Sequence, residues 1–214
     1  MSVLIIENLY LKVSKEIYAL FNINLEVNQG EHVALIGQKG SGRTPLLRCI
    51  CGLEKQFEGS VSINGEDVKT YDFSEKFQMG YLPSYPVFFD TKTVRYNLEY
   101  VLKIRKVDKT LISTKVNDIL DEFGLNRVAD NNIYQLSNFE KFLVAIARLR
   151  LRKLNLVVID SFEDNFTEKE NQVLTAHLEK LYNSETTVIK ALESTSPTYE
   201  NFRIVNMKNG GIVQ

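Results

Sequence analysis

The residues with the clearest chemical potential form the glycine-rich segment Gly37-Gln38-Lys39-Gly40-Ser41-Gly42-Arg43-Thr44. Glycines let backbone amides approach a phosphate, a following helix N-terminus adds positive potential, a cation reaches the terminal phosphates and a hydroxyl holds Mg²⁺. The segment therefore predicts a phosphate-binding loop, although Arg43 stands where such loops have lysine. The alternative is a glycine-rich turn that binds nothing. The residues predicted to bind the nucleotide are Gly37, Lys39, Gly40, Ser41, Gly42, Arg43 and Thr44.

The sequence on either side of this loop has the patterns needed to position it. The apolar run 33–36 predicts a buried strand before the loop. Leu46, Leu47, Ile50 and Cys51 recur at helical spacing after it, and the next residue is a glycine placed to end that helix. A phosphate loop requires this strand–loop–helix context.

The rest of the chain alternates between strand and helix patterns. Phe21, Ile23, Leu25 and Val27 alternate with polar residues, which predicts a strand with one wet face. The remaining elements that we expect are a strand at 61–63, helices around 116–123 and 142–146, a buried strand at 156–159, a helix around 173–181, a strand at 187–192 and a hairpin over 204–213. This order predicts an α/β fold around a mainly parallel sheet, in one domain with a helical subdomain.

Composition excludes several classes of function. The chain has 214 residues, 44% of them hydrophobic and 25% charged, and its formal charge is −1. This balance excludes a basic body that holds nucleic acid by charge alone. No apolar stretch is long enough to span a membrane, and no basic segment precedes the apolar residues of the N-terminus, so we expect a cytosolic protein. Cys49 and Cys51 fit neither a zinc spacing nor a disulfide framework.

In this order along the chain, the motifs resemble the ATP-binding subunits of ABC transporters. After the phosphate loop, residues 80–83 resemble the Q-loop, 136–148 the signature motif with its helix, and 156–160 the Walker B strand. The resemblance implies a P-loop NTPase fold of the ABC type with an N-terminal antiparallel β-subdomain. It also implies one domain over residues 1–214, with the core at about 1–84 and 150–214 and the helical subdomain at about 85–149.

The resemblance also implies ligands and partners. ATP and Mg²⁺ are the expected cofactors, with Thr44 and Asp160 as metal ligands. The expected partners are a transmembrane permease subunit and a second ATP-binding subunit, in a homodimer or heterodimer, and no nucleic acid. The protein would then be cytoplasmic and peripheral at the inner face of the membrane. Tyr10 and Tyr18 are both candidates for stacking on adenine.

Several positions depart from the pattern of this family. Arg43 replaces the lysine, and Pro45 removes a backbone N–H next to it. Ser84 stands at the Q-loop glutamine, Ser161 at the general-base glutamate and Glu193 at the switch histidine. A serine without a neighbouring base cannot take a proton from water at neutral pH, and Glu193 would repel a terminal phosphate.

The signature motif, which closes the ATP site of the opposite subunit in this family, is also altered. Leu136 and Ser137 are retained, but Asn138, Phe139 and Glu140 replace Gly-Gly-Gln. Glycine permits close approach of backbone to phosphate, and the side chain of Phe139 would obstruct it.

Three hypotheses follow. The first is a degenerate subunit of an ABC complex, in which ATP binding is weak or retained and hydrolysis is impaired. The second is an active ATPase that energises transport together with a partner subunit, and the third is a scaffold or regulator that binds no nucleotide. The aromatic loop Ser84–Phe89 is expected either to dock on the permease or to pack between the two subdomains.

Overall fold

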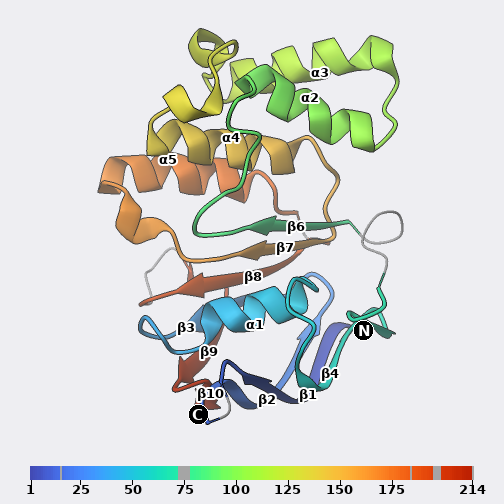
Figure 1. Ribbon diagram of the computed structural model, residues 1–214, viewed down its shortest axis with the longest axis vertical. Coiled ribbons are helices and arrows are strands. Elements are labelled where there is room, and N and C mark those ends of the chain that lie inside the picture. The colour runs from blue at the N-terminus through green and yellow to red at the C-terminus, as the bar shows by residue number, and fades with distance from the viewer. Residues whose placement is uncertain (15, 72–77, 184, 195–198, 214) are drawn as a thin grey trace. The chain divides into compact units, whose positions relative to one another are not determined.

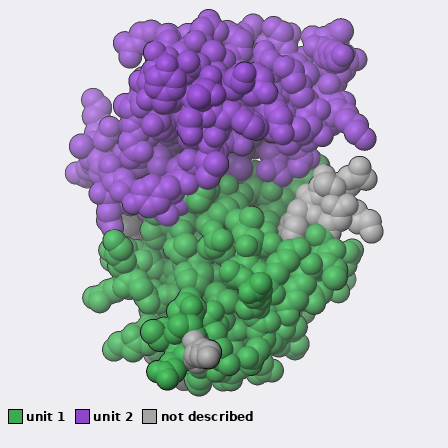
Figure 2. Space-filling view, in the orientation of Figure 1, with its two compact units in different colours: residues 1–83, 154–161, 182–214 green, residues 84–153, 162–181 purple. Residues whose placement is uncertain are grey.

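A computed structural model describes residues 1–14, 16–71, 78–183, 185–194 and 199–213 (Figure 1). The chain forms two compact units, which Figure 2 distinguishes by colour. The first unit comprises residues 1–83, 154–161 and 182–214, and the second comprises 84–153 and 162–181. The division of one domain into a core and a single helical insertion at about 85–149 stays a prediction.

The first unit contains two β-sheets. One has four strands in the order β2-β1-β4-β5, all paired antiparallel. The other has six strands in the order β10-β9-β3-β8-β7-β6, in which only the pair β9–β10 is antiparallel. The strands are β1 (Ser2–Lys12), β2 (Tyr18–Asn28), β3 (His32–Ile36), β4 (Glu58–Ile63), β5 (Glu66–Asp67), β6 (Met79–Leu82), β7 (Leu156–Ile159), β8 (Thr187–Leu192), β9 (Arg203–Lys208) and β10 (Gly211–Val213). The α/β architecture predicted from the sequence, with a mainly parallel sheet and an N-terminal antiparallel subdomain, is confirmed.

Helix α1 (Arg43–Ile50) joins the two sheets through one apolar core. Its side chains Leu46, Leu47 and Ile50 are fully buried in a cluster that contains residues of both sheets, such as Leu4 of β1 and Leu35 of β3. Burial of a leucine or isoleucine stabilises the fold by roughly 1.5–3 kcal/mol per side chain. The start of α1 is thereby fixed against the end of β3, which holds the loop between them.

The alternation expected for the strand around Phe21 is wrong at that residue. Ile23, Leu25 and Val27 are buried as predicted, but Phe21 is exposed and Leu20 takes the inward place. Asn22 has a φ of 50°, and the pairing of β1 with β2 shifts register between Leu9 and Leu11. An irregularity of this kind moves the residues beyond it to the other face of the sheet.

The second unit is helical. Its α-helices are α2 (Val94–Ile104), α3 (Lys109–Glu122), α4 (Asn138–Arg150) and α5 (Glu168–Glu179), with short 3₁₀ turns at Asn126–Val128, Ile133–Gln135 and Glu163–Asn165. The helix expected around 173–181 begins earlier, because Thr167 accepts a hydrogen bond from the Glu170 amide and caps it. Across the described ranges, no helix combines the length and apolar character needed to cross a membrane.

Candidate functional site

The glycine-rich loop is held in a tight conformation between β3 and α1. Gly42 has a φ of +102°, and a Cβ there would lie 2.8 Å from the carbonyl oxygen of Ala19. A Cβ on Gly37 would lie 2.4 Å from the carbonyl oxygen of Met207. Only glycine fits at these two positions, because other residues would combine a steric clash with, at Gly42, a strained backbone.

The turn between β9 and β10 is hydrogen-bonded to the glycine-rich loop. The Gly210 amide donates a hydrogen bond to the Ser41 carbonyl at 3.0 Å, and the Gly210 carbonyl accepts one from the Phe21 amide at 2.8 Å. Sequence reasoning predicted this hairpin but not its place beside the loop. The glycine pair that predicts the turn, Gly210-Gly211, is a local signal, whereas the position of the hairpin depends on the pairing of β9 with β3.

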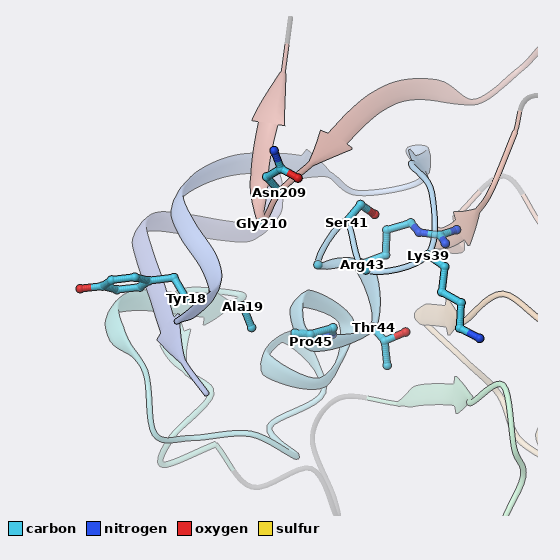
Figure 3. A pocket seen from close by; sticks show the side chains of 11 residues that line it. Tyr18, Ala19, Lys39, Ser41, Arg43, Thr44, Pro45, Asn209 and Gly210 are labelled. Atoms are coloured by element: carbon cyan, nitrogen blue, oxygen red, sulfur yellow. The ribbon is translucent and has the colours of Figure 1, made fainter. Parts of the chain in front are cut away.

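A pocket of about 370 Å³ opens at the loop (Figure 3). Its lining residues are Tyr18, Ala19, Lys39, Gly40, Ser41, Gly42, Arg43, Thr44, Pro45, Asn209 and Gly210. In the view of Figure 3, Tyr18 and Lys39 lie at opposite ends. Tyr10 is not among these lining residues; its ring packs edge-on against the ring of Tyr18, with centroids 6.1 Å apart. Of the two aromatic candidates for an adenine contact, only Tyr18 borders the pocket.

The Arg43 side chain points to the carboxyl ends of the neighbouring strands. Its Nη1 donates a hydrogen bond to Ser161 Oγ at 2.9 Å, and its Nη2 lies 3.6 Å from Glu193 Oε1. The Arg43 side chain is only 8% exposed, and its charge is compensated by Glu193, whose side chain is 44% exposed. The structure thus brings together the residues at the lysine, general-base and switch positions of the sequence pattern.

Thr44 and Asp160 form the second polar contact of the site. The Thr44 hydroxyl lies 3.0 Å and 2.9 Å from the two carboxylate oxygens of Asp160. Asp160 is 2% exposed and also accepts a hydrogen bond from the Ser161 amide at 3.0 Å. Hydroxyl and carboxylate oxygens are the hard ligands that Mg²⁺ prefers, and one or two of them with nucleotide phosphates and waters suffice. The residues present therefore fit a magnesium ion, which Thr44 and Asp160 would hold.

The charge of Asp160 affects its buried neighbours. Burial raises the pKa of the Tyr81 phenol, and the negative charge of Asp160 adds to the increase. The pKa of the Cys51 thiol is raised for the same two reasons. Both groups therefore stay neutral at physiological pH.

The other residues singled out from the sequence belong to the second unit. Ser84 is half-buried at its start. Ser137 caps α4, because its hydroxyl accepts a hydrogen bond from the Glu140 amide while the Glu140 carboxylate accepts from the Ser137 amide and hydroxyl. Phe139 packs edge-on against Phe166, with centroids 6.4 Å apart.

These contacts give part of the altered signature motif a local structural role. Glu140 completes a capping box, a pattern that its spacing from Ser137 could have predicted. Leu136 is buried and Asn138 is exposed. The assignment of these five positions to a nucleotide contact stays a prediction.

Comparisons with known proteins bear on the family and the fold of the chain. The model of the family described as ABC transporter matches residues 20–162. The sulfate/thiosulfate import ATP-binding protein CysA of Synechocystis is 32% identical over 198 residues, which cover 92% of this chain and 56% of that protein. The molybdate/tungstate import ATP-binding protein WtpC of Methanocaldococcus jannaschii is 29% identical over 164 residues, 77% of this chain and 54% of that protein. The chain thus spans little more than half the length of these two relatives.

Solved structures agree with the fold. A dimeric post-hydrolysis state of an ATP-binding cassette, bound to ADP and Pi, superposes with a TM-score of 0.85 at 24% identity, over 99% of this chain and 97% of that one. The ADP conformation of another ATP-binding cassette of an ABC transporter gives a TM-score of 0.77 at 23% identity, over 100% of this chain and 90% of that one. The P-loop α/β fold of the ABC type, expected from the sequence, is confirmed.

Proposed function

Because the chain belongs to the ABC transporter family, as its sequence motifs predict, we propose that it is an ATP-binding subunit of an ABC import complex whose own site hydrolyses ATP poorly. The import role is supported by the names of the relatives, which are import ATP-binding proteins for sulfate/thiosulfate and for molybdate/tungstate. Under this proposal the chain acts beside a transmembrane permease subunit and a second ATP-binding subunit, at the cytoplasmic face of the membrane.

Nucleotide binding is supported by the residues of the site that keep the family pattern, namely the glycine-rich loop, Thr44 and Asp160. The glycine-rich loop presents its backbone at the start of α1, beside the exposed side chain of Lys39. Thr44 and Asp160 offer oxygen ligands for Mg²⁺, which supplies positive charge to the phosphates when it is bound. Pro45 offers no backbone N–H at the third residue of α1, so one donor to the phosphates is lost.

Impaired hydrolysis is supported by a single observation, the hydrogen bond from Arg43 to Ser161. A general base must accept a proton from the attacking water at neutral pH, and a serine hydroxyl does not. Here the oxygen of Ser161 already accepts a hydrogen bond from a guanidinium, which makes it less basic still. Loss of a general base alone lowers a rate by about 10²–10⁴.

The aromatic loop supports docking on the permease. Tyr85 and Val87 of this loop are 76% and 80% exposed. Its backbone is nevertheless fixed, since Arg148 donates a hydrogen bond to the Val87 carbonyl at 2.7 Å and lies over the Phe88 ring. A fixed loop that exposes large apolar side chains is typical of a surface that a partner covers.

The second candidate function is an active ATPase that works with a partner subunit. It is favoured by the similarity to proteins named as import ATP-binding proteins and by the retained pair Thr44 and Asp160. In a heterodimer, the partner would supply the site that turns over. Our main proposal differs from this candidate only in the turnover of this chain's own site.

Calorimetric titration of the full chain with ATP, with and without Mg²⁺, tests nucleotide binding, and phosphate release tests turnover. We expect binding that Mg²⁺ strengthens, and phosphate release at the background rate. Thr44→Ala is the control, since it should remove the response to Mg²⁺. Turnover on the order of 1 s⁻¹, a typical enzyme rate, would favour the second candidate, and no heat at millimolar ATP would exclude both.

A further inference from the structure

Three of the departures from the family pattern, at Arg43, Ser161 and Glu193, form one contact network rather than three separate losses. The guanidinium of Arg43 donates a hydrogen bond to Ser161 and forms an ion pair with Glu193. The Arg43 side chain is almost fully buried, whereas the Glu193 side chain is 44% exposed. The cation at the lysine position therefore has a protein carboxylate as its partner in the absence of any ligand.

This network lies at the edge of the sheet where a ligand of the loop would extend. Strands β3, β8 and β7 are parallel neighbours, so their carboxyl ends share one edge. The loop follows β3, Glu193 directly follows β8, and Ser161 comes two residues after β7. Parallel sheets bind their ligands at this edge.

We propose that the pocket takes a nucleoside diphosphate in preference to a triphosphate, because the Arg43–Glu193 pair occupies the place of the terminal phosphate. The inference rests on the proposed function, since it specifies the ligand of the same site. A third phosphate would have to displace Glu193 from Arg43 and would bring a second negative charge beside that carboxylate. A diphosphate meets neither obstacle.

The remaining groups of the pocket suffice for two phosphates. Backbone amides of the loop and the start of α1 donate to phosphate oxygens without a change of charge in the protein. Lys39 is exposed and lines the same pocket, and within the described ranges it pairs with no carboxylate. Its ammonium is therefore the cation that can approach a diphosphate without breaking an existing contact.

Calorimetric titration of the full chain separates the two ligands. The probes are ADP and an ATP analogue with an imido bridge between the β- and γ-phosphates, both with Mg²⁺. We expect ADP to bind about tenfold more tightly, the size of effect that a like charge a few ångströms away produces at intermediate dielectric constants. The imido bridge keeps any residual hydrolysis out of the measurement.

The variant Glu193→Gln tests whether the charge of Glu193 causes the preference for a diphosphate. It keeps the shape of the side chain and removes its charge, so the affinity for the ATP analogue should rise about tenfold while that for ADP stays within about twofold. Glu66→Gln on β5 is the matched control, because it removes the same charge from an exposed residue that does not line the pocket. This control should leave both affinities unchanged.

The outcomes separate this inference from the proposed function. Tighter binding of the analogue than of ADP by the unaltered chain, or an unchanged ratio in Glu193→Gln, would overturn the preference for a diphosphate and leave nucleotide binding intact. Absence of binding for both nucleotides at millimolar concentration would overturn both proposals.

Discussion

The substitution Asn97→Ala should detach the aromatic loop from the helix that holds it. Asn97 lies on α2 with 1% of its surface exposed. Its Oδ1 accepts a hydrogen bond from the Phe89 amide at 3.0 Å. Its Nδ2 donates to the carbonyls of Phe89 at 3.2 Å and Thr93 at 2.9 Å. One buried amide therefore fixes the end of the loop that exposes Tyr85.

The magnitude follows from which groups lose their partners. The Phe89 carbonyl keeps a hydrogen bond from the Lys92 amide at 2.9 Å, and the Thr93 carbonyl keeps one from the Asn97 amide at 3.1 Å. The Phe89 N–H has no second partner within the described residues. Because this contact is part-buried, the donor left without a partner costs about 1 kcal/mol, and the other lost hydrogen bonds and the small void bring the expected loss of unfolding free energy to about 2–4 kcal/mol.

Urea unfolding and amide hydrogen exchange measure this effect. The exchange of the Phe89 amide should accelerate more than that of amides inside α4, because the loop opens locally. Asn131→Ala, at an exposed position of the same unit, removes the same atoms and should cost less than about 0.5 kcal/mol. A loss below about 1 kcal/mol for Asn97→Ala, or no change in Phe89 exchange, would refute the anchoring role of Asn97.

Three further predictions follow from the site and its supports. Asp160→Asn keeps an acceptor for the Thr44 hydroxyl and the Ser161 amide but removes the charge, so ATP binding should become independent of Mg²⁺ in calorimetry while the protein stays folded. Gly42→Ala should lower the unfolding free energy by more than about 2 kcal/mol, because Gly42 has a φ of +102° and a Cβ there would clash with Ala19. Gly40→Ala should cost only about 1 kcal/mol, because Gly40 has a φ of +87° but no atom lies within 4 Å of its Cβ. Equal losses in urea unfolding would show that the clash does not matter. Burial raises the pKa of the Cys49 thiol to about 12, so its thiolate fraction at pH 8 is on the order of 10⁻⁴. Alkylation followed by mass spectrometry should therefore label Cys49 only in urea. Rapid labelling of Cys49 in the folded protein would contradict its burial.

The parts of the fold predicted from the sequence are those with a local signal. The buried strand at 33–36 and the helix after the loop carry uninterrupted apolar patterns, and both lie where expected. Strand β1 carries no such signal, because its register shifts break the period of two: Leu4, Ile6, Leu9 and Leu11 are buried at uneven spacing. The 11-residue helix α2 lies within the helical subdomain that the resemblance implies, but its own apolar spacing is not among the helical patterns read from the sequence.

In the candidate site, too, only the parts with a local sequence signal could be predicted. The spacing of the glycines and of Thr44 predicts a loop from a contiguous segment, but the contact between Arg43 and Glu193 joins residues 150 positions apart. That contact depends on the order of the strands in the sheet, with β8 next to β3. In the sequence, Arg43, Ser161 and Glu193 are three separate departures, whereas in the structure one guanidinium contacts both of the other side chains.

The burial of Arg43 explains why these departures belong together. A guanidinium removed from water requires a charge partner and hydrogen-bond acceptors, and without them it is strongly destabilising. A histidine at position 193 would offer no negative charge, so an arginine at position 43 would depend on a bound phosphate for compensation. Glu193 provides this compensation within the protein, and Ser161 leaves room for the fork of the guanidinium beside it. The charge of Arg43 is therefore balanced without a ligand, whereas a cation at this position facing a histidine would need a phosphate to balance it.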